Sequence, residues 1–177
     1  MKEVEVLFRI DDERAQMLRD KLKDCFVQHV RETDTYFYPP HKDFSVTENG
    51  RENLRVRQSV NRNELTYKNV RYKEGKYTHS IEKNARLDNG EDAIEILSAL
   101  GFRVHFVVDK SREIFQDGDY KITIDDVQGL GIFVEVEWSG KEGDESELQT
   151  ACISKARELG LDKVQDKGYL TLLEEKR

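Results

Sequence analysis

The stretch IDDVQGLGIFVEVE, residues 124–137, decides the fold of this chain. Its centre, residues 129–131, reads Gly-Leu-Gly, a combination typical of a tight turn between two strands. On both sides of the turn apolar and polar residues alternate, and this period of two predicts strands with one apolar face. On the second strand the alternating residues are Val134, Glu135, Val136 and Glu137. The stretch therefore predicts an antiparallel hairpin with one acidic face.

The same alternation extends outward over most of the chain. Together with the hairpin it predicts eight strands, at residues 3–10, 33–38, 54–57, 65–68, 77–83, 102–115, 120–126 and 132–138. Apolar residues at helical spacing predict helices that begin near Asp12, Asn89 and Ser146, with a short helix in the tail around residues 169–173. Closure of an antiparallel sheet removes its exposed edges. We therefore expect an α+β, mainly β fold: an eight-stranded antiparallel β-barrel with helices packed outside, the tail included.

Length and composition restrict the class of protein. The 177 residues contain no evident linker, which predicts a single domain over 1–177. The formal net charge of −7 argues against a nucleic-acid-binding surface. Cys25 and Cys152 are too few for a disulfide framework and fit no zinc pattern, so we expect two free thiols. Because no apolar segment approaches transmembrane length, we expect a cytoplasmic monomer or homodimer without a membrane partner.

Charged residues occur at alternate positions within the predicted strands. Each pair shares one face of its strand, and the neighbouring positions are mostly apolar. The pairs are Glu3 and Glu5, Arg55 and Arg57, Lys110 and Arg112, and Glu135 and Glu137, with Lys68 and Asp125 as single charges. On any one strand such a face usually points to solvent. Across the whole sheet, the helices could instead cover the apolar faces and leave the charged faces inside.

A charged interior predicts a charged ligand. Buried charges cost free energy unless they pair with one another or with a ligand. Carboxylates bind hard cations such as Mg²⁺ (or Mn²⁺), whereas arginine and lysine bind phosphate oxygens. The mixed signs therefore favour a small-molecule polyphosphate ligand with its metal. They argue against a carrier of apolar ligands, because such a barrel needs an apolar lining.

Six motifs in one order resemble the CYTH superfamily, which groups class IV adenylate cyclases with thiamine triphosphatases and inorganic triphosphatases. Residues 3–7, EVEVL, resemble the family's Glu-x-Glu-x-Lys signature, and residues 124–137 resemble its Asp-x-x-x-Gly-Leu-Gly-x-Phe-x-Glu-x-Glu run. The others are LRVR at 54–57, LTYK at 65–68, Glu82 and KSR at 110–112. Nearly the whole chain is covered, and residues 34–40 and 168–170 are most similar to the cyclase branch.

The resemblance implies a triphosphate tunnel and a role for each charged residue. It implies that the metal ligands are Glu3, Glu5, Asp125, Glu135 and Glu137. It implies that the triphosphate is held by Arg55, Arg57, Lys68, Lys110 and Arg112. The catalytic step would then depend on Glu3, Glu5, Arg57 and Lys110.

One position departs from the family signature. Leu7 stands where the family has a lysine that orients the phosphates or the attacking water, and a leucine does neither. Arg9, on the same face of the strand, is a candidate to compensate. We expect an adenylate cyclase that converts ATP to cyclic AMP and pyrophosphate. The alternatives are a triphosphatase acting on inorganic, thiamine or nucleoside triphosphate, and a non-catalytic protein that binds a phosphorylated ligand, which Leu7 favours.

Overall fold

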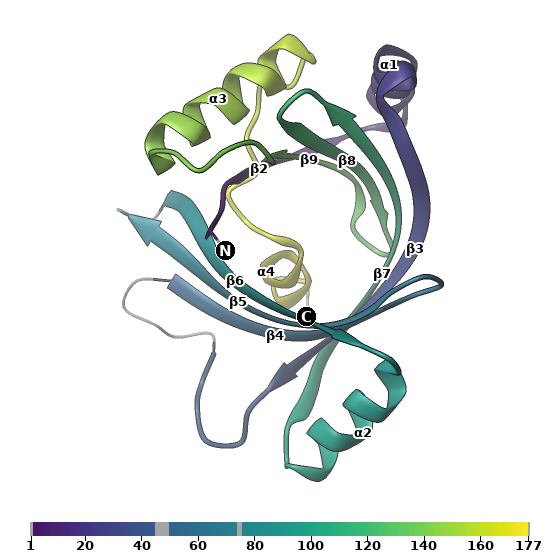
Figure 1. Ribbon diagram of the computed structural model, residues 1–177, viewed down its shortest axis with the longest axis vertical. Helices are drawn as coiled ribbons and strands as arrows, with labels where there is room; N and C mark the ends of the chain where they lie inside the picture. Colours follow the sequence, from purple (N-terminus) through teal and green to yellow (C-terminus); the bar gives the residue numbers. More distant parts are fainter. Residues whose placement is uncertain (1, 45–49, 74–75, 177) are drawn as a thin grey trace. The chain divides into compact units, whose positions relative to one another are not determined.

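A computed structural model of the chain describes residues 2–44, 50–73 and 76–176, and Figure 1 shows its strands and helices. One antiparallel sheet has the strand order β1-β6-β5-β4-β3-β7-β8-β9-β2. The strands are β1 (Lys2–Glu3), β2 (Glu5–Ile10), β3 (Phe26–Tyr38), β4 (Gly50–Ser59), β5 (Asn63–Lys73), β6 (Lys76–Leu87), β7 (Arg103–Asp117), β8 (Tyr120–Val127) and β9 (Gly131–Trp138). The helices are α1 (Asp12–Leu22), a 3₁₀ turn η1 (Lys23–Cys25), α2 (Gly90–Ala99), α3 (Glu145–Glu158) and α4 (Tyr169–Glu174). The expectation of a mainly β, antiparallel fold is confirmed.

The first predicted strand is divided in the structure, so the sheet has nine strands where eight were predicted. The division falls at Val4 because the chain changes partner there: β1 pairs with β6, and β2 pairs with β9. These two short strands are the first and the last in the sheet order, although only Val4 separates them along the chain. Most other strands extend beyond their predicted limits; β3, for example, begins at Phe26 rather than at Thr33.

The chain forms two compact units, which we call unit 1 (Met1–Glu3 and Arg31–Asp109) and unit 2 (Val4–Val30 and Lys110–Arg177). Unit 1 contains β1, β4, β5, β6 and α2, and unit 2 contains β2, β8, β9, α1, α3 and α4. The long strands β3 and β7 contribute a part to each unit. Among the described helices, none is long and apolar enough to cross a membrane.

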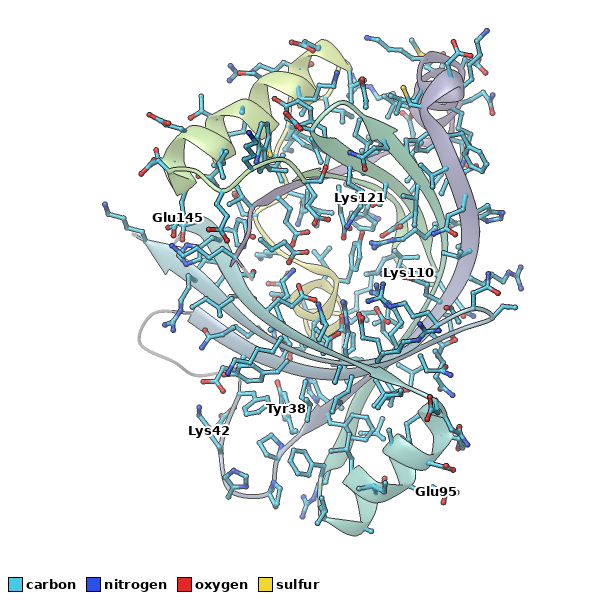
Figure 2. The ribbon with its side chains drawn as sticks, viewed as in Figure 1. Tyr38, Lys42, Glu95, Lys110, Lys121 and Glu145 are labelled. Atoms are coloured by element: carbon cyan, nitrogen blue, oxygen red, sulfur yellow. The ribbon has the colours of Figure 1, made fainter. Side chains whose placement is uncertain are left out.

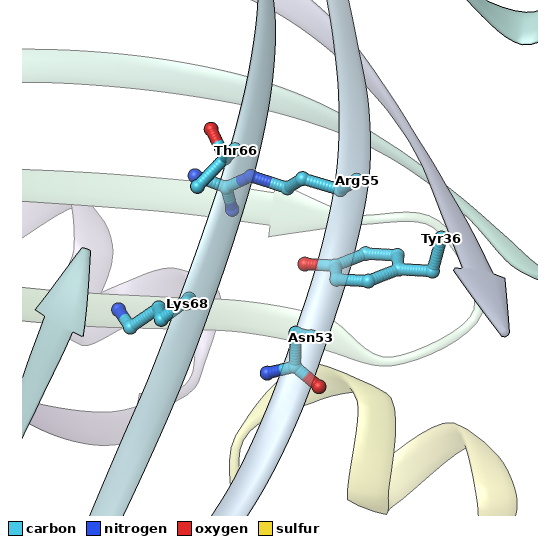
Figure 3. Close-up of a pocket in the computed structure, with 5 residues that line it drawn as sticks. All are labelled: Tyr36, Asn53, Arg55, Thr66 and Lys68. Carbon is cyan, nitrogen blue, oxygen red and sulfur yellow. The ribbon is translucent and has the colours of Figure 1, made fainter. Parts of the chain in front are cut away.

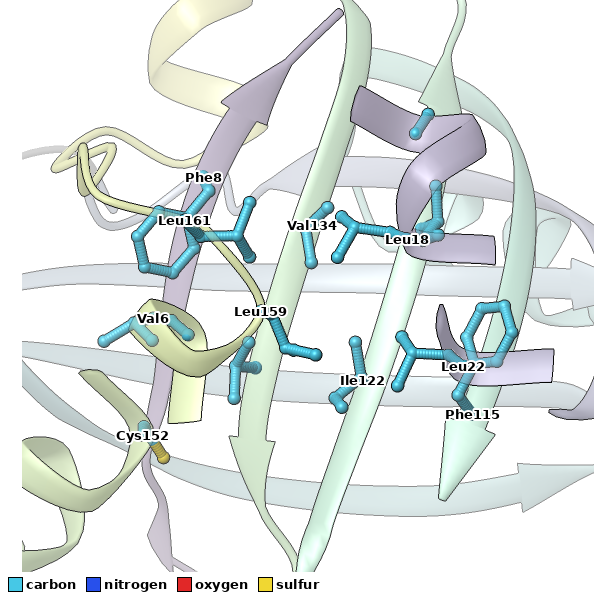
Figure 4. Close-up of a cluster of buried hydrophobic side chains, with 14 residues drawn as sticks. Val6, Phe8, Leu18, Leu22, Phe115, Ile122, Val134, Cys152, Leu159 and Leu161 are labelled. Atoms are coloured by element: carbon cyan, nitrogen blue, oxygen red, sulfur yellow. The ribbon is translucent and has the colours of Figure 1, made fainter. Parts of the chain in front are cut away.

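The hydrophobic core of unit 2 lies between the sheet and two helices. Val6 and Phe8 of β2 face the same side as the apolar residues of β8 and β9, and α1 and α3 cover that side (Figure 4). Each such side chain contributes roughly 1.5–3 kcal/mol when fully buried. Asp11 caps α1 through the amide of Arg14 (2.9 Å), as expected. Helix α3 begins at Glu145, next to the predicted Ser146, and Asp144 caps it because its carboxylate accepts the free amides of the first turn.

The Gly-Leu-Gly turn joins β8 to β9 as the sequence predicts. Gly129 and Gly131 have φ of 78° and 100°, a region that favours glycine. Between them the Leu130 amide donates to the Val127 carbonyl at 3.0 Å, and the Leu130 side chain is buried. The turn therefore fixes the register that places Asp125 opposite Phe133.

The tail does not pack outside, and this corrects the predicted position of its helix. Leu161 still belongs to the apolar core, but Gln165 donates its amide to the Leu7 carbonyl (2.7 Å) along the edge of β2. Past that edge, Tyr169 of α4 packs on Phe133, with ring centroids 5.0 Å apart, on the polar face of the sheet. Within unit 2, α3 and α4 therefore lie on opposite faces of the sheet, as Figure 1 also shows.

Unit 1 is built on the meander of β4, β5 and β6. The side chains of Val56 on β4 and of Phe37 on the adjacent β3 are fully buried on one face of the sheet. Helix α2 contacts β4 and β5 and is capped by Asn89, whose side chain accepts from the Glu91 amide at 2.9 Å. The opposite face carries the arginines and lysine that the sequence analysis identified.

Candidate functional site

The polar face of unit 1 contains a pocket between β3, β4 and β5. The strand register brings Tyr36 opposite Arg55, Arg55 opposite Thr66, and Asn53 opposite Lys68. The space in it that a water-sized molecule can occupy is about 20 Å³, and Figure 3 shows the side chains around it. Its lining residues are Tyr36, Asn53, Arg55, Thr66 and Lys68. Two of the predicted triphosphate ligands, Arg55 and Lys68, are thus brought together beside three neutral polar side chains.

Arg57 is held by two carboxylates of β3. Its Nε and Nη2 donate to the two carboxylate oxygens of Asp34 at 2.6 and 2.7 Å, and its Nη1 lies 3.3 Å from Glu32. A bidentate pair of this kind fixes the orientation of the guanidinium group. Arg57 therefore links β3 to β4 on their polar face. It is not among the residues that line the pocket.

Arg55 is engaged more weakly than Arg57. Its nearest described carboxylate oxygens lie 3.5 Å away on Asp34 and 3.8 Å away on Glu82. Its buried Nε has no hydrogen-bond partner among the described residues. Burial lowers the pKa of Arg55, but Asp34, Tyr36 and Glu82 outweigh it and hold that pKa well above its usual value. Arg55 is therefore a permanent cation with hydrogen-bonding capacity to spare.

Lys68 lies between two carboxylates of unit 1. Its Nζ is 2.5 Å from Glu3 and 4.0 Å from Glu82. Burial raises the pKa of Glu82, and the neighbouring Glu3 raises it further, while Lys68 and Arg55 lower it. The Glu82 carboxyl therefore holds a proton more readily than an exposed glutamate. Glu3, predicted as a metal ligand, forms an ion pair with Lys68.

The cations of unit 2 are buried in a tight network. Arg112 donates to both oxygens of Asp125, at 2.7 and 2.5 Å, and to Glu135 at 2.6 Å. Lys110 lies 3.9 Å from Asp125 and is only 6% exposed. The network satisfies Arg112 without a ligand, whereas Arg55 makes only long ion pairs among the described residues.

Helix α4 covers this network. The Tyr169 hydroxyl donates to Asp125 at 2.8 Å, and the Lys110 ammonium lies 5.6 Å from the centre of the Tyr169 ring. Burial raises the pKa of Tyr169 well above its usual value, and Asp125 and Glu135 raise it further, so the phenol stays protonated and acts as a donor. Figure 2 shows Lys110 and Lys121 on the side of β7 and β8 where α4 lies.

The predicted metal ligands of unit 2 differ in their suitability for a cation. Glu5 and Glu137 are directly opposite each other on β2 and β9, and Lys121 forms an ion pair with Glu137. Two like charges at this position destabilise the strand pair unless a cation neutralises them, so the donor set suits a hard divalent ion. Asp125, by contrast, is fully buried and both its oxygens accept hydrogen bonds from Arg112. Glu135 is likewise bound to Arg112.

Leu7 lies on this same polar face, directly opposite Glu135. Arg9 does not approach that position: its Nη2 donates to the Leu130 carbonyl at 2.7 Å, and its guanidinium lies 5.7 Å from the centre of the Phe133 ring. Glu135 pairs with Arg112 instead. In this structure Arg9 therefore does not take the place of the lysine that the family has at position 7.

Several residues of these networks were not predicted from the sequence. Asp34, Glu32 and Tyr36 alternate along β3 and share the face that carries Arg55 and Arg57. Their spacing in the segment ETDTY contains this signal, since alternate residues of a strand point to one side. Tyr169 carried no such signal, because its contact with Asp125 joins residues 44 positions apart.

Comparisons with known proteins agree with the sequence motifs. The CYTH domain matches residues 1–169. A protein of Methanocaldococcus jannaschii named "Putative adenylate cyclase MJ0240" is 33% identical over 178 residues, which cover 97% of this chain and 98% of the relative.

Solved structures share the fold over the whole chain. The PH1819 protein of Pyrococcus horikoshii has a TM-score of 0.85 and 32% identity, covering 99% of each chain. A Hippeastrum adenylyl cyclase homologue, whose structure is described as revealing a dominant triphosphatase activity, has a TM-score of 0.71 and 15% identity. It covers 99% of this chain and 96% of its own. At that identity the similarity concerns the fold alone.

Proposed function

Because the chain belongs to the CYTH family, we propose that it is an enzyme of the adenylate cyclase type that binds a nucleoside triphosphate together with Mg²⁺ or Mn²⁺. The proposed reaction converts ATP to cyclic AMP and pyrophosphate. The observation that carries the proposal is the pocket of unit 1, in which Arg55 and Lys68 stand beside three neutral polar side chains. The 33% identical relative, with its adenylate cyclase name, supports the same reaction.

The phosphate chain would bind first to the two cations that line the pocket, Arg55 and Lys68. Arg55 has an unpaired Nε among the described residues and long contacts to its carboxylates. Lys68 supplies a second positive charge on the neighbouring strand. Arg57 would act indirectly. Its hydrogen bond to Asp34 holds that carboxylate beside Arg55. Charge neutralisation and positioning of this kind account for most of the rate in phosphoryl and nucleotidyl transfer.

The proposed metal ligands are Glu5 and Glu137, whose facing carboxylates suit a hard cation. When bound, the ion would neutralise phosphate charge and stabilise the leaving oxygen. The chain's own contribution is to hold the two carboxylates across β2 and β9 while Lys121 limits their repulsion.

Leu7 favours the cyclase over hydrolysis. A hydrolase has to hold and activate a water, whereas in the cyclase the attacking hydroxyl belongs to the bound nucleotide. On β2 the side chain of Leu7 lies opposite Glu135. This side chain is apolar and cannot donate a hydrogen bond to a water. The absence of a lysine at this position should therefore reduce cyclase activity less than triphosphatase activity.

The test is to incubate the protein with ATP, thiamine triphosphate and inorganic triphosphate, each with Mg²⁺ or Mn²⁺, and to follow the products by phosphorus NMR. We expect cyclic AMP and pyrophosphate from ATP, and loss of both in an Arg55→Ala variant. Orthophosphate as the only product would replace the cyclase with a triphosphatase. Shifted substrate lines without product would leave a protein that binds the ligand and does not turn it over.

Triphosphate hydrolysis is the second candidate, and one observation favours it. The Hippeastrum structure with the same fold is described as having dominant triphosphatase activity, although it is also named as an adenylyl cyclase. The phosphate contacts would be the same in either reaction. The ratio of orthophosphate to cyclic AMP from one ATP sample distinguishes the two.

A further inference from the structure

The pocket of unit 1 is smaller than a nucleotide site. The space in it that a water-sized molecule can occupy is about 20 Å³, far below the roughly 300–1,000 Å³ of pockets that enclose whole drug-sized ligands. Every lining side chain can donate a hydrogen bond, and none is a carboxylate. A pocket this small with these donors suits the oxygens of a single phosphoryl group of a longer ligand.

Tyr36 adds a neutral donor to this set. It is 8% exposed, and it lines the pocket together with Arg55 and Lys68. Because neither a guanidinium nor an ammonium group has an acceptor, the Tyr36 hydroxyl cannot donate its proton to either of them, and a ligand oxygen in the pocket can accept it. Figure 3 shows the hydroxyl directed toward the space between the Arg55 guanidinium and the Lys68 ammonium.

We propose that the Tyr36 hydroxyl donates a hydrogen bond directly to a phosphoryl oxygen of the triphosphate that Arg55 and Lys68 bind. Tyr36 would be a substrate-binding residue in addition to its contact with Arg55. The inference rests on the proposed function, because it requires a phosphate in the pocket. It goes further in assigning a neutral donor and in restricting the pocket to one phosphoryl group.

The experiment measures the Kd of inorganic triphosphate with Mg²⁺ by calorimetry for the wild-type chain and four variants, one of which combines Tyr36→Phe with Arg55→Lys. Tyr36→Phe removes only the hydroxyl. Tyr67→Phe is the matched control, because Tyr67 lies between Thr66 and Lys68 on β5 but points to the opposite face, where its hydroxyl contacts Asn69 and Glu52. Arg55→Lys provides a background with an altered guanidinium site. Melting curves confirm that each variant is folded.

We expect Tyr36→Phe to raise the Kd about tenfold, the loss of one hydrogen bond to a charged group, and Tyr67→Phe to leave it unchanged. We expect a similar increase when Tyr36→Phe is added to Arg55→Lys, because a direct bond to the ligand does not act through Arg55. Binding of ATP should weaken by the same factor.

Three outcomes would overturn the inference. An unchanged Kd in folded Tyr36→Phe, with binding weakened by Arg55→Lys, would exclude the contact but leave the proposed function standing. An effect of Tyr36→Phe that disappears in the Arg55→Lys background would mean that the hydroxyl only positions Arg55. Absence of any triphosphate binding by the wild-type chain would remove the proposed function and the inference together.

Discussion

Units 1 and 2 both carry arginine and lysine at alternate strand positions, but the two sets of cations are used differently. In unit 1, Arg55 makes only long contacts with carboxylates and lines an open pocket with Lys68. In unit 2, Arg112 makes three short bonds to Asp125 and Glu135, and Tyr169 covers them. The same sequence pattern therefore gives a weakly engaged arginine beside a pocket in one unit and an arginine satisfied by carboxylates in the other.

The difference shows that a charge on an inner strand face is not sufficient to identify a ligand contact. A buried cation that already has short bonds to carboxylates must exchange those partners before it binds a phosphate, and the exchange offsets much of the gain. A cation with long contacts loses little interaction energy when it exchanges its carboxylates for a phosphate. The predictions that follow test this comparison.

The largest expected effect is at Arg55. Arg55→Ala should weaken triphosphate binding by about 100-fold, roughly 3 kcal/mol, because it removes a charge-assisted donor from the pocket. Calorimetry with inorganic triphosphate measures this loss. The control is Arg62→Ala, which removes an exposed arginine from the same unit, and equal losses for the two variants would contradict the assignment.

A direct comparison of the two lysines comes second. Lys68→Met should raise the Kd for triphosphate about tenfold, while Lys110→Met should change it less, because Lys68 lines the pocket whereas Lys110 is only 6% exposed and lies beside the Tyr169 ring. The same calorimetry applies to both variants. If Lys110→Met weakened binding as much as Lys68→Met, the covered network of unit 2 would have to open in the bound state.

The hydrogen bond from Tyr169 of α4 to Asp125 should contribute to the free energy of unfolding. Tyr169→Phe removes a buried hydrogen bond to a charged group, so the free energy of unfolding should fall by about 1.5–3 kcal/mol. Chemical denaturation measures the change, and Tyr120→Phe, whose ring packs on Trp138, is the control. Equal stability of Tyr169→Phe and wild type would mean that α4 contributes little to the network.

At Leu7 we expect a shift between products. Leu7→Lys introduces a cation opposite Glu135, in the position where the family has its lysine, and should raise the ratio of orthophosphate to cyclic AMP formed from ATP. Phosphorus NMR on one sample gives the ratio, and Val60→Lys, at a 94% exposed position, controls for the added charge. An unchanged ratio would mean that Leu7 does not decide between the two reactions.

The smallest effect concerns the two thiols, both of which are free cysteines as predicted. Burial raises the pKa of Cys152 to about 12, and Glu137 and Glu5 add to the shift. Only the thiolate reacts, so Cys152 should stay unreactive at pH 8 to 9, and the less buried Cys25 should be alkylated first. Mass spectrometry after brief alkylation checks the order, and faster modification of Cys152 would show that the core of unit 2 opens.

The strand alternation and the motif order determined much of this protein in advance. Val134 and Val136 against Glu135 and Glu137 fixed which face of β9 is apolar, because a period of two leaves no other assignment. The turn at Gly129 and the helix cap at Asn89 followed from local backbone chemistry. The resemblance to CYTH rested on short motifs within single strands, and such local signals survive without knowledge of the tertiary structure.

The tertiary structure decided what the charged residues do. The sequence placed Arg55, Arg57, Lys110 and Arg112 on polar faces, but their partners come from strands that are distant in the chain. Only the fold brought Asp34 to Arg57 and Tyr169 to Asp125, and with them the contrast between an open pocket and a covered network. Local pattern specifies the direction of a side chain, whereas its partner and its remaining hydrogen-bonding capacity depend on packing between segments far apart in sequence.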